Sequence, residues 1–250
     1  QLDMDRLDYL RRDSFFTGVT EGNIGSARII KMLNVVEDSL VVESKGIYSI
    51  ENYLTSRRLM YWQVYLHKTA VAYEKVLINA LKRAKYLVQQ GKQLFCPPAL
   101  KYFLHNAIDR YWFQNHAEAL TMYEQLDDTD IWCTLKVWQN SEDKILSLLA
   151  KDMINRNVFK VEVREKPVTE EEIYALKDNI AKHFSITFDD ATYLMSVNTI
   201  QKDMYDINDD KIAILYKDGT LKDISEASEI LNVELLSKKI SKYYLCYQRF

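Results

Sequence analysis

Residues 2–13 place acidic, phenolic and basic side chains at a spacing that could serve phosphate chemistry. Read as a helix, the segment stacks Asp5, Tyr9 and Asp13 on one face, because residues four apart lie above one another along a helix. Arg6 and Arg12 lie beside this face. Carboxylates can bind a metal ion, a phenol can contact a substrate hydroxyl, and arginine suits phosphate oxygens. The helix could therefore hold a metal, a hydroxyl-bearing substrate and phosphate.

A solvated helix face is the alternative interpretation of the same segment. Asp8 could pair with Arg11 or Arg12, and such pairs contribute only a few tenths of a kcal/mol. Leu7 and Leu10, with Met4 before them, recur at a spacing of three and could form the stripe that packs on the core. Charged helix faces are common, so spacing alone favours this ordinary interpretation.

The segment resembles the last metal-binding motif of the HD-domain phosphohydrolases, and most of all that of the deoxynucleoside-triphosphate triphosphohydrolases. In that motif an aspartate within a D-x-D-[RK]-x-D-Y-x-x-R-D helix completes the metal site. Arg57 and the run 65–68 resemble the family's helix that lines the nucleotide pocket. Residues 126–131, 156–160 and 193–247 resemble later landmarks, including a small appended domain. The resemblance thus spans nearly the whole chain.

The resemblance implies a metal ligand and two phosphate-binding residues. Asp5 would bind a divalent metal ion, and the sequence does not distinguish Mg, Mn, Fe, Ni and Zn. Arg6 and Arg57 would bind the phosphates. Without the family match, each arginine would be assigned to the surface or to an ion pair.

The resemblance also implies contacts with the nucleoside. Tyr9 and Asp13 would contact the sugar, and Tyr65 would stack on or border the base. Where the triphosphohydrolases place a histidine and a glutamine in this helix, the chain has Tyr61 and Leu66. Loss of a polar residue that reads the base weakens the case for a particular nucleobase.

The chain lacks the motif that gives the HD enzymes their name. No His-Asp dipeptide occurs, and all four histidines follow the aspartate motif. The chain begins with Gln1 inside an expected helix, so we interpret it as the C-terminal portion of a longer protein. One metal ligand of four should not hold a catalytic metal by itself, and we expect this chain alone to be inactive.

Two functions from different classes remain open. The first is a metal-dependent phosphohydrolase acting on (deoxy)nucleoside triphosphates or related phosphate esters, with a dimer or tetramer as its assembly. The alternative is an HD-derived protein without catalysis that binds nucleotides or serves as a scaffold. The net charge of −3 argues against nucleic acid as the main partner. No apolar run reaches the length of a membrane span, and a cytoplasmic location is expected.

The pattern of the chain predicts a mainly α fold. Residues 1–157 should form the helical C-terminal half of an HD domain with one β-hairpin, and residues 158–250 a small α+β domain. Strands are expected at 39–43 and 46–50. A helix should then run with a bend to Gln90.

Further elements are expected on both sides of the change of period near residue 157. Pro97-Pro98 should begin a helix, and acidic residues at 127–130 and 140–143 should cap two more. Later elements are a strand near 158–163, a helix from Thr169 to His183, a strand near 193–197, a hairpin around Asp218-Gly219, and a final helix or helix pair from 225 or 226.

Overall fold

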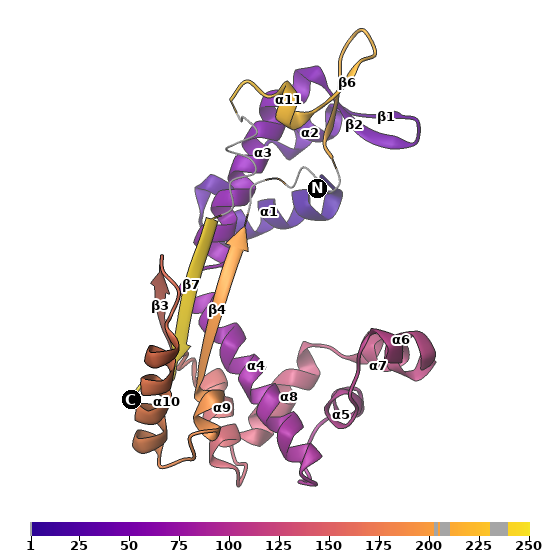
Figure 1. The fold of residues 1–250 in the computed structure, drawn as a ribbon. Coiled ribbons are helices and arrows are strands. Elements are labelled where there is room, and N and C mark those ends of the chain that lie inside the picture. Colours follow the sequence, from indigo (N-terminus) through magenta and orange to yellow (C-terminus); the bar gives the residue numbers. More distant parts are fainter. Residues whose placement is uncertain (1, 203–204, 206–210, 231–239) are drawn as a thin grey trace. The chain divides into compact units, whose positions relative to one another are not determined.

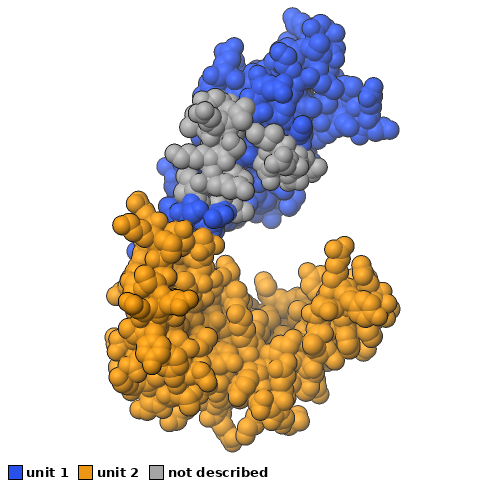
Figure 2. Space-filling view, in the orientation of Figure 1, with its two compact units in different colours: residues 1–70, 200–242 blue, residues 71–199, 243–250 orange. Residues whose placement is uncertain are grey.

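The computed structural model describes residues 2–202, 205, 211–230 and 240–250. Helices dominate (Figure 1), which confirms the predicted mainly α class with a small α+β part. Two compact units are distinguished (Figure 2): unit 1 comprises residues 1–70 and 200–242, and unit 2 comprises 71–199 and 243–250. Within the described residues, no helix combines the length and the apolar composition needed to cross a bilayer.

The two units do not follow the boundary at residue 157. In unit 1, strand β2 (Ser39–Glu43) pairs in parallel with β5 (Ala213–Leu215), so that Val41 lies opposite Ala213. A pairing of segments so distant in sequence leaves no local signal. The assignment of 1–157 and 158–250 as domains of the family stays a prediction.

Helix α1 (Met4–Thr17) begins and ends where local chemistry requires. The Asp3 carboxylate accepts the backbone N–H of Arg6 at 2.7 Å, which satisfies one open donor of the first turn. Gly18 ends the helix at φ 72°, a conformation that suits glycine. Its neighbouring elements are the 3₁₀ turn η1 (Thr20–Gly22) and α2 (Ser26–Lys31).

The packing stripe of α1 differs in part from the predicted one. Leu7 and Leu10 are buried as expected, but Met4 is 50% exposed. Ser14 takes the next buried position of the helix, and its hydroxyl donates to the Val19 carbonyl at 2.8 Å. The stripe therefore runs toward the end of the helix rather than from its first residue.

The β-hairpin lies earlier in the sequence than predicted. Strand β1 (Leu33–Val36) pairs antiparallel with β2, joined by Glu37 and Asp38 at φ 49° and 58°. Two positive φ values are typical of the type I′ turn, whose twist matches that of the flanking strands, although the usual Asn-Gly or Asp-Gly signal is missing.

The strand predicted at 46–50 is wrong. Gly46 ends the 3₁₀ turn η2 (Ser44–Gly46), and α3 (Ile47–Met60) follows directly. A Cβ on this glycine would lie 2.7 Å from Val42 Cγ1, so close packing explains the glycine and a hairpin turn does not.

The predicted long helix with a bend is confirmed. After α3 the chain continues as the π-helical segment η3 (Tyr61–Tyr65) and then as α4 (Lys68–Gln89). Gly91 follows the end of α4 at φ 79°. The bend thus has a physical cause, a local change of helical register.

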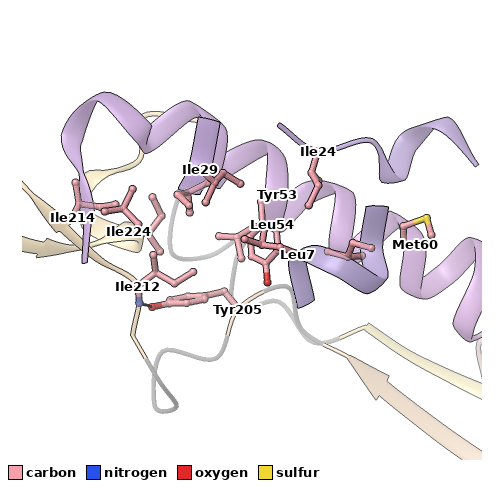
Figure 3. Packing of buried hydrophobic residues seen from close by; sticks show 13 residues of the cluster. Leu7, Ile24, Ile29, Tyr53, Leu54, Met60, Tyr205, Ile212, Ile214 and Ile224 are labelled. Atoms are coloured by element: carbon pink, nitrogen blue, oxygen red, sulfur yellow. Dashed lines mark hydrogen bonds between the residues drawn. The ribbon is translucent and has the colours of Figure 1, made fainter. Parts of the chain in front are cut away.

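The core of unit 1 joins the N-terminal helices to the later strands. Figure 3 shows Ile212 next to Tyr205, and the same buried cluster contains Ile29, Ile214 and Ile224. The Tyr205 hydroxyl accepts the backbone N–H of Ile212 at 2.9 Å, which satisfies the polar end of a buried phenol. The remaining elements of this part are β6 (Leu221–Asp223), antiparallel to β5 across the predicted Asp-Gly turn, and α11 (Ile224–Ala227).

Unit 2 is built around helices whose starts match the sequence signals. Asp127 and Asp130 form a reciprocal capping box, and Thr169 with Glu172 forms another. Asp143 caps a third helix through the N–H of Leu146. The helices are α5 (Pro98–His105), α6 (Arg110–Asn115), α7 (Ala117–Gln125), α8 (Asp128–Trp138), α9 (Lys144–Asn155), α10 (Glu170–Phe184) and the 3₁₀ segment η4 (Asp190–Leu194).

The final helix or helix pair predicted from 225 or 226 begins as α11, but from Ile240 the chain forms a strand instead. Strand β7 (Ile240–Tyr247) lies between β3 (Lys160–Arg164) and β4 (Met195–Lys202). A run rich in tyrosine suits a strand. Residues 231–239 of the predicted helix lie outside the described residues.

Asp152 of α9 gives a prediction for stability against pH. Its side chain is buried, Oδ2 has no hydrogen-bond partner in the described part of the chain, and burial raises its pKa to about 6 against the opposing hydrogen bond from Gln248. The folded state therefore holds this proton more tightly than the unfolded state, whose pKa is near 3.8. The protonated carboxyl therefore contributes on the order of 3 kcal/mol to the free energy of unfolding at low pH, and this contribution is lost as pH rises from about 4 to about 6.

Replacing Asp152 by asparagine should remove that loss. Urea unfolding at pH 4.5 and pH 7 should show that the free energy of unfolding of the variant, relative to the natural chain, is higher at pH 7 than at pH 4.5. A constant difference at both pH values would contradict the assignment.

Candidate functional site

The first turn of α1 holds a charged, half-buried arginine. The guanidinium of Arg6 donates to the second oxygen of the Asp3 carboxylate, the same group that caps the helix. Burial alone would lower the pKa of Arg6, but the charge of Asp3, with smaller effects of Tyr53 and Tyr9, outweighs it and raises the pKa. Arg6 is thus a fixed cation at the helix N-terminus.

A hydrogen bond joins the two elements that carry the predicted nucleoside contacts. The Tyr65 hydroxyl donates to Asp13 Oδ2 at 2.7 Å, although these residues are 52 positions apart. The Tyr9 ring meets that of Tyr65 edge to face, with centroids 5.9 Å apart. Burial, and then the hydrogen bond to Asp13, raise the pKa of Tyr65, while burial also raises that of Tyr9. Both phenols keep their protons at neutral pH.

Arg57 of α3 lies close enough to Tyr9 for its charge to act on that phenol. Its guanidinium carbon lies 5.8 Å from the centre of the Tyr61 ring, within range for a cation–π contact. Its charge reaches Tyr9 and Tyr53, since it opposes the rise in the pKa of both phenols. Arg57 Nη1 is buried and has no hydrogen-bond partner within the described residues. An unpaired buried donor costs about 1–3 kcal/mol, which makes it a rare feature in need of a reason.

Tyr53 is a member of the cluster that the sequence analysis did not identify. It is fully buried on α3, and burial raises its pKa to about 12. It precedes Arg57 by four residues, so both lie on one helix face. That spacing was visible in the sequence, but a tyrosine in an apolar helix suggests ordinary packing.

The π-helical segment η3 brings one further phenol, Tyr61, against Tyr65. The Leu66 N–H donates to the Tyr61 carbonyl at 2.7 Å, a bond that spans five residues. The rings of Tyr61 and Tyr65 meet edge to face with centroids 5.3 Å apart. Single π-helical turns recur at functional sites because they shift side chains out of α-helical register.

Asp5 lies apart from these contacts. Its carboxylate is exposed on the first turn of α1 and is a hard oxygen donor suited to a divalent cation. The part of the chain that the structure describes holds no group of three or more His, Cys, Asp or Glu side chains placed for a metal. Asp5 is thus the residue that the family resemblance assigns to the metal, and its exposed carboxylate is open to a cation.

The structure brings five of the six predicted residues into one cluster. Contacts or charge interactions connect Arg6, Tyr9, Asp13, Arg57 and Tyr65. The ordinary alternative is also present on the other side of α1, where Arg12 pairs with Asp8 at 2.5 Å. One helix thus carries both a solvated face and a face turned toward α3.

A family model matches the segment that carries part of this cluster. Residues 24–93 match the family model described as the HD associated region, a range that includes Arg57, Tyr61 and Tyr65 but not α1. A solved phosphohydrolase from Bacteroides thetaiotaomicron is 63% identical with a TM-score of 0.91, over all of this chain and 62% of that one.

Two curated relatives extend the comparison. The uncharacterized protein YwfO of Bacillus subtilis is 33% identical over 96% of this chain and 53% of its own length. A protein of Dictyostelium discoideum named deoxynucleoside triphosphate triphosphohydrolase SAMHD1 homolog is 28% identical over 38% of this chain and 18% of its own length. The chain spans about half the length, or less, of the curated relatives it matches. Together with the HD associated region, these similarities support an HD-type phosphohydrolase.

Proposed function

We propose that this chain forms the substrate-binding side of an HD-type, metal-dependent phosphohydrolase that acts on (deoxy)nucleoside triphosphates or related phosphate esters. The observation that carries the proposal is the convergence of two arginines and a phenol–carboxylate pair from distant segments. The hydrogen bond from Tyr65 to Asp13 joins those segments. Each group has a matching partner in a nucleotide.

Arg6 and Arg57 are the proposed phosphate-binding residues. Guanidinium groups donate in pairs to phosphate oxygens, and such charge-assisted bonds are about twice as strong as neutral ones. The unpaired Nη1 of Arg57 supports this role, because a donor without a protein acceptor is available to an anion after a small side-chain movement. Arg6 already binds Asp3, so it would share its charge between that carboxylate and the substrate.

Tyr9, Asp13 and Tyr65 are the proposed contacts for the sugar and base. Asp13 accepts one bond from Tyr65, and a carboxylate has capacity for further donors such as a sugar hydroxyl. The protonated phenols can donate to sugar oxygens, and their rings can border a base. This arrangement fits a hydroxyl-bearing phosphate ester.

Asp5 is proposed to be one ligand of the divalent metal in the complete protein. A metal of this kind activates water and stabilises charge on the phosphoryl group. The other ligands would come from residues outside this chain.

The complete protein is proposed to form a homo-oligomer, a dimer or a tetramer. Phe15 and Phe16 at the end of α1 are 80% and 78% exposed. They line a cavity of about 660 Å³ together with Arg11 and Arg12. Exposed aromatic surface rimmed by charge is typical of protein contacts.

A nucleotide panel tests the proposed function. The complete protein should release phosphate or triphosphate from at least one nucleotide when Mg, Mn or Ni is added, and chelation should stop the release. A protein that binds nucleotides but stays inactive with every metal would favour the non-catalytic alternative. A protein that neither binds nor hydrolyses them would contradict both functions.

A further inference from the structure

Tyr61 occupies the junction between the proposed phosphate and nucleoside contacts. One face of its ring lies under the Arg57 guanidinium, with 5.8 Å between the ring centre and the guanidinium carbon. Its ring meets Tyr65 at a centroid distance of 5.3 Å and an interplanar angle of 69°. A side-chain hydrogen bond also links it to Tyr9. Tyr61 thus contacts one proposed phosphate-binding residue, Arg57, and two proposed nucleoside contacts, Tyr9 and Tyr65.

The π-helical turn explains how Tyr61 reaches all three neighbours. The bond from the Leu66 N–H to the Tyr61 carbonyl widens the turn by one residue compared with an α-helix. The edge-to-face geometry holds the ring plane against Tyr65. The orientation of Tyr61 is therefore fixed by backbone register and by packing.

We propose that Tyr61 is a positioning residue that holds Arg57 through its ring and Tyr9 through its hydroxyl, and so sets the separation between the phosphate and hydroxyl contacts of the substrate. This inference rests on the proposed function. The two contacts of Tyr61 are chemically separable, because phenylalanine keeps the ring and loses only the hydroxyl. Leucine removes both.

The separable contacts predict different effects on two ligands. Inorganic tripolyphosphate reports the phosphate contacts alone, and a nucleoside triphosphate reports the phosphate and hydroxyl contacts together. With Tyr61→Phe, tripolyphosphate should bind within about twofold of the natural protein, while the nucleotide should bind about 5-fold more weakly. With Tyr61→Leu, both ligands should bind at least about 5-fold more weakly, because the cation–π contact is also lost.

Calorimetric binding to the complete protein measures both constants without requiring turnover. If the leucine variant fails to fold, Tyr61→Trp takes its place in the test. Tryptophan keeps an aromatic face for Arg57, so this variant should retain tripolyphosphate binding. Tyr48→Leu on α3 is the matched control, since Tyr48 is 63% exposed and should leave both constants unchanged.

The inference has outcomes that overturn it separately from the proposed function. If the natural protein hydrolyses nucleotides but Tyr61→Phe weakens both ligands equally, or neither, Tyr61 does not separate the two contacts and this inference alone is wrong. If the natural protein binds neither ligand, the proposed function and the inference both fail.

Discussion

Replacing Arg83 by methionine should lower the free energy of unfolding by about 3–5 kcal/mol, the usual cost of removing one partner from a buried ion pair. Arg83 lies on α4 with 8% of its side chain exposed. It donates to both oxygens of Asp143 at 3.1 and 2.6 Å, and to Asp190 at 2.6 Å. Methionine would leave two carboxylates in low-dielectric surroundings without their cation.

The neighbours of Arg83 make this loss hard to repair. Its guanidinium carbon lies 5.2 Å from the centre of the Tyr86 ring and 5.0 Å from that of Tyr193. Asp143 is also the N-cap of α9, so one arginine connects α4, α9 and η4. Burial alone would lower the pKa of Arg83, but its bonds to both aspartates raise it, and the pair stays charged.

Arg164 provides the matched control in the same unit. It also binds two carboxylates, Glu162 and Glu172, each at 2.7 Å, but 32% of its side chain is exposed. Because solvent screens such pairs, Arg164→Met should cost less than about 1 kcal/mol. Urea unfolding of the chain measures both variants. Equal losses would show that burial does not govern the Arg83 network.

Replacing Asp5 by alanine in the complete protein should lower turnover at least about 100-fold and reduce the bound metal. The reason is that loss of a charged oxygen ligand weakens both the metal site and the activation of water. Metal content by elemental analysis and phosphate release by a colorimetric assay give the two readouts. Unchanged values in both would remove Asp5 from the proposed metal site.

Asp8 on the same helix controls for a general effect of charge. It is exposed and pairs with Arg12, which is the ordinary role that spacing alone predicts. Asp8→Ala should therefore leave turnover and metal content within about twofold of the natural protein. A comparable loss in both variants would indicate damage to α1 rather than loss of a ligand.

Local chemistry explains which parts of the fold were predictable. Helix starts at Asp127, Asp143 and Thr169 depend on a side chain that reaches its own first turn, so the sequence contains the whole signal. The end of α1 at Gly18 is local in the same way. The three helix starts were predicted correctly.

The missed elements depend on partners distant in sequence or on weak turn signals. The turn at Glu37 and Asp38 adopts positive φ without glycine or asparagine, so its strand was placed on the wrong side. Strand β7 is stabilised by pairing with β3, where Lys160 lies opposite Tyr247. Neither feature follows from periodicity.

The candidate site shows the same division. The residues of α1 came from spacing within one helix, whereas their connection to Arg57 and Tyr65 came only from the family resemblance. The structure supplied the hydrogen bond from Tyr65 to Asp13 and the buried position of Tyr53. The unpaired Nη1 of Arg57 could not be predicted, because it depends on every neighbouring acceptor.

A crystal structure of the complete protein with a divalent metal and a non-hydrolysable nucleoside triphosphate tests the central claim most directly. Phosphate oxygens should lie at Arg6 and Arg57, the sugar against Tyr9 and Asp13, and the metal on Asp5. A nucleotide bound elsewhere, with this cluster unchanged and free of ligand, would contradict it.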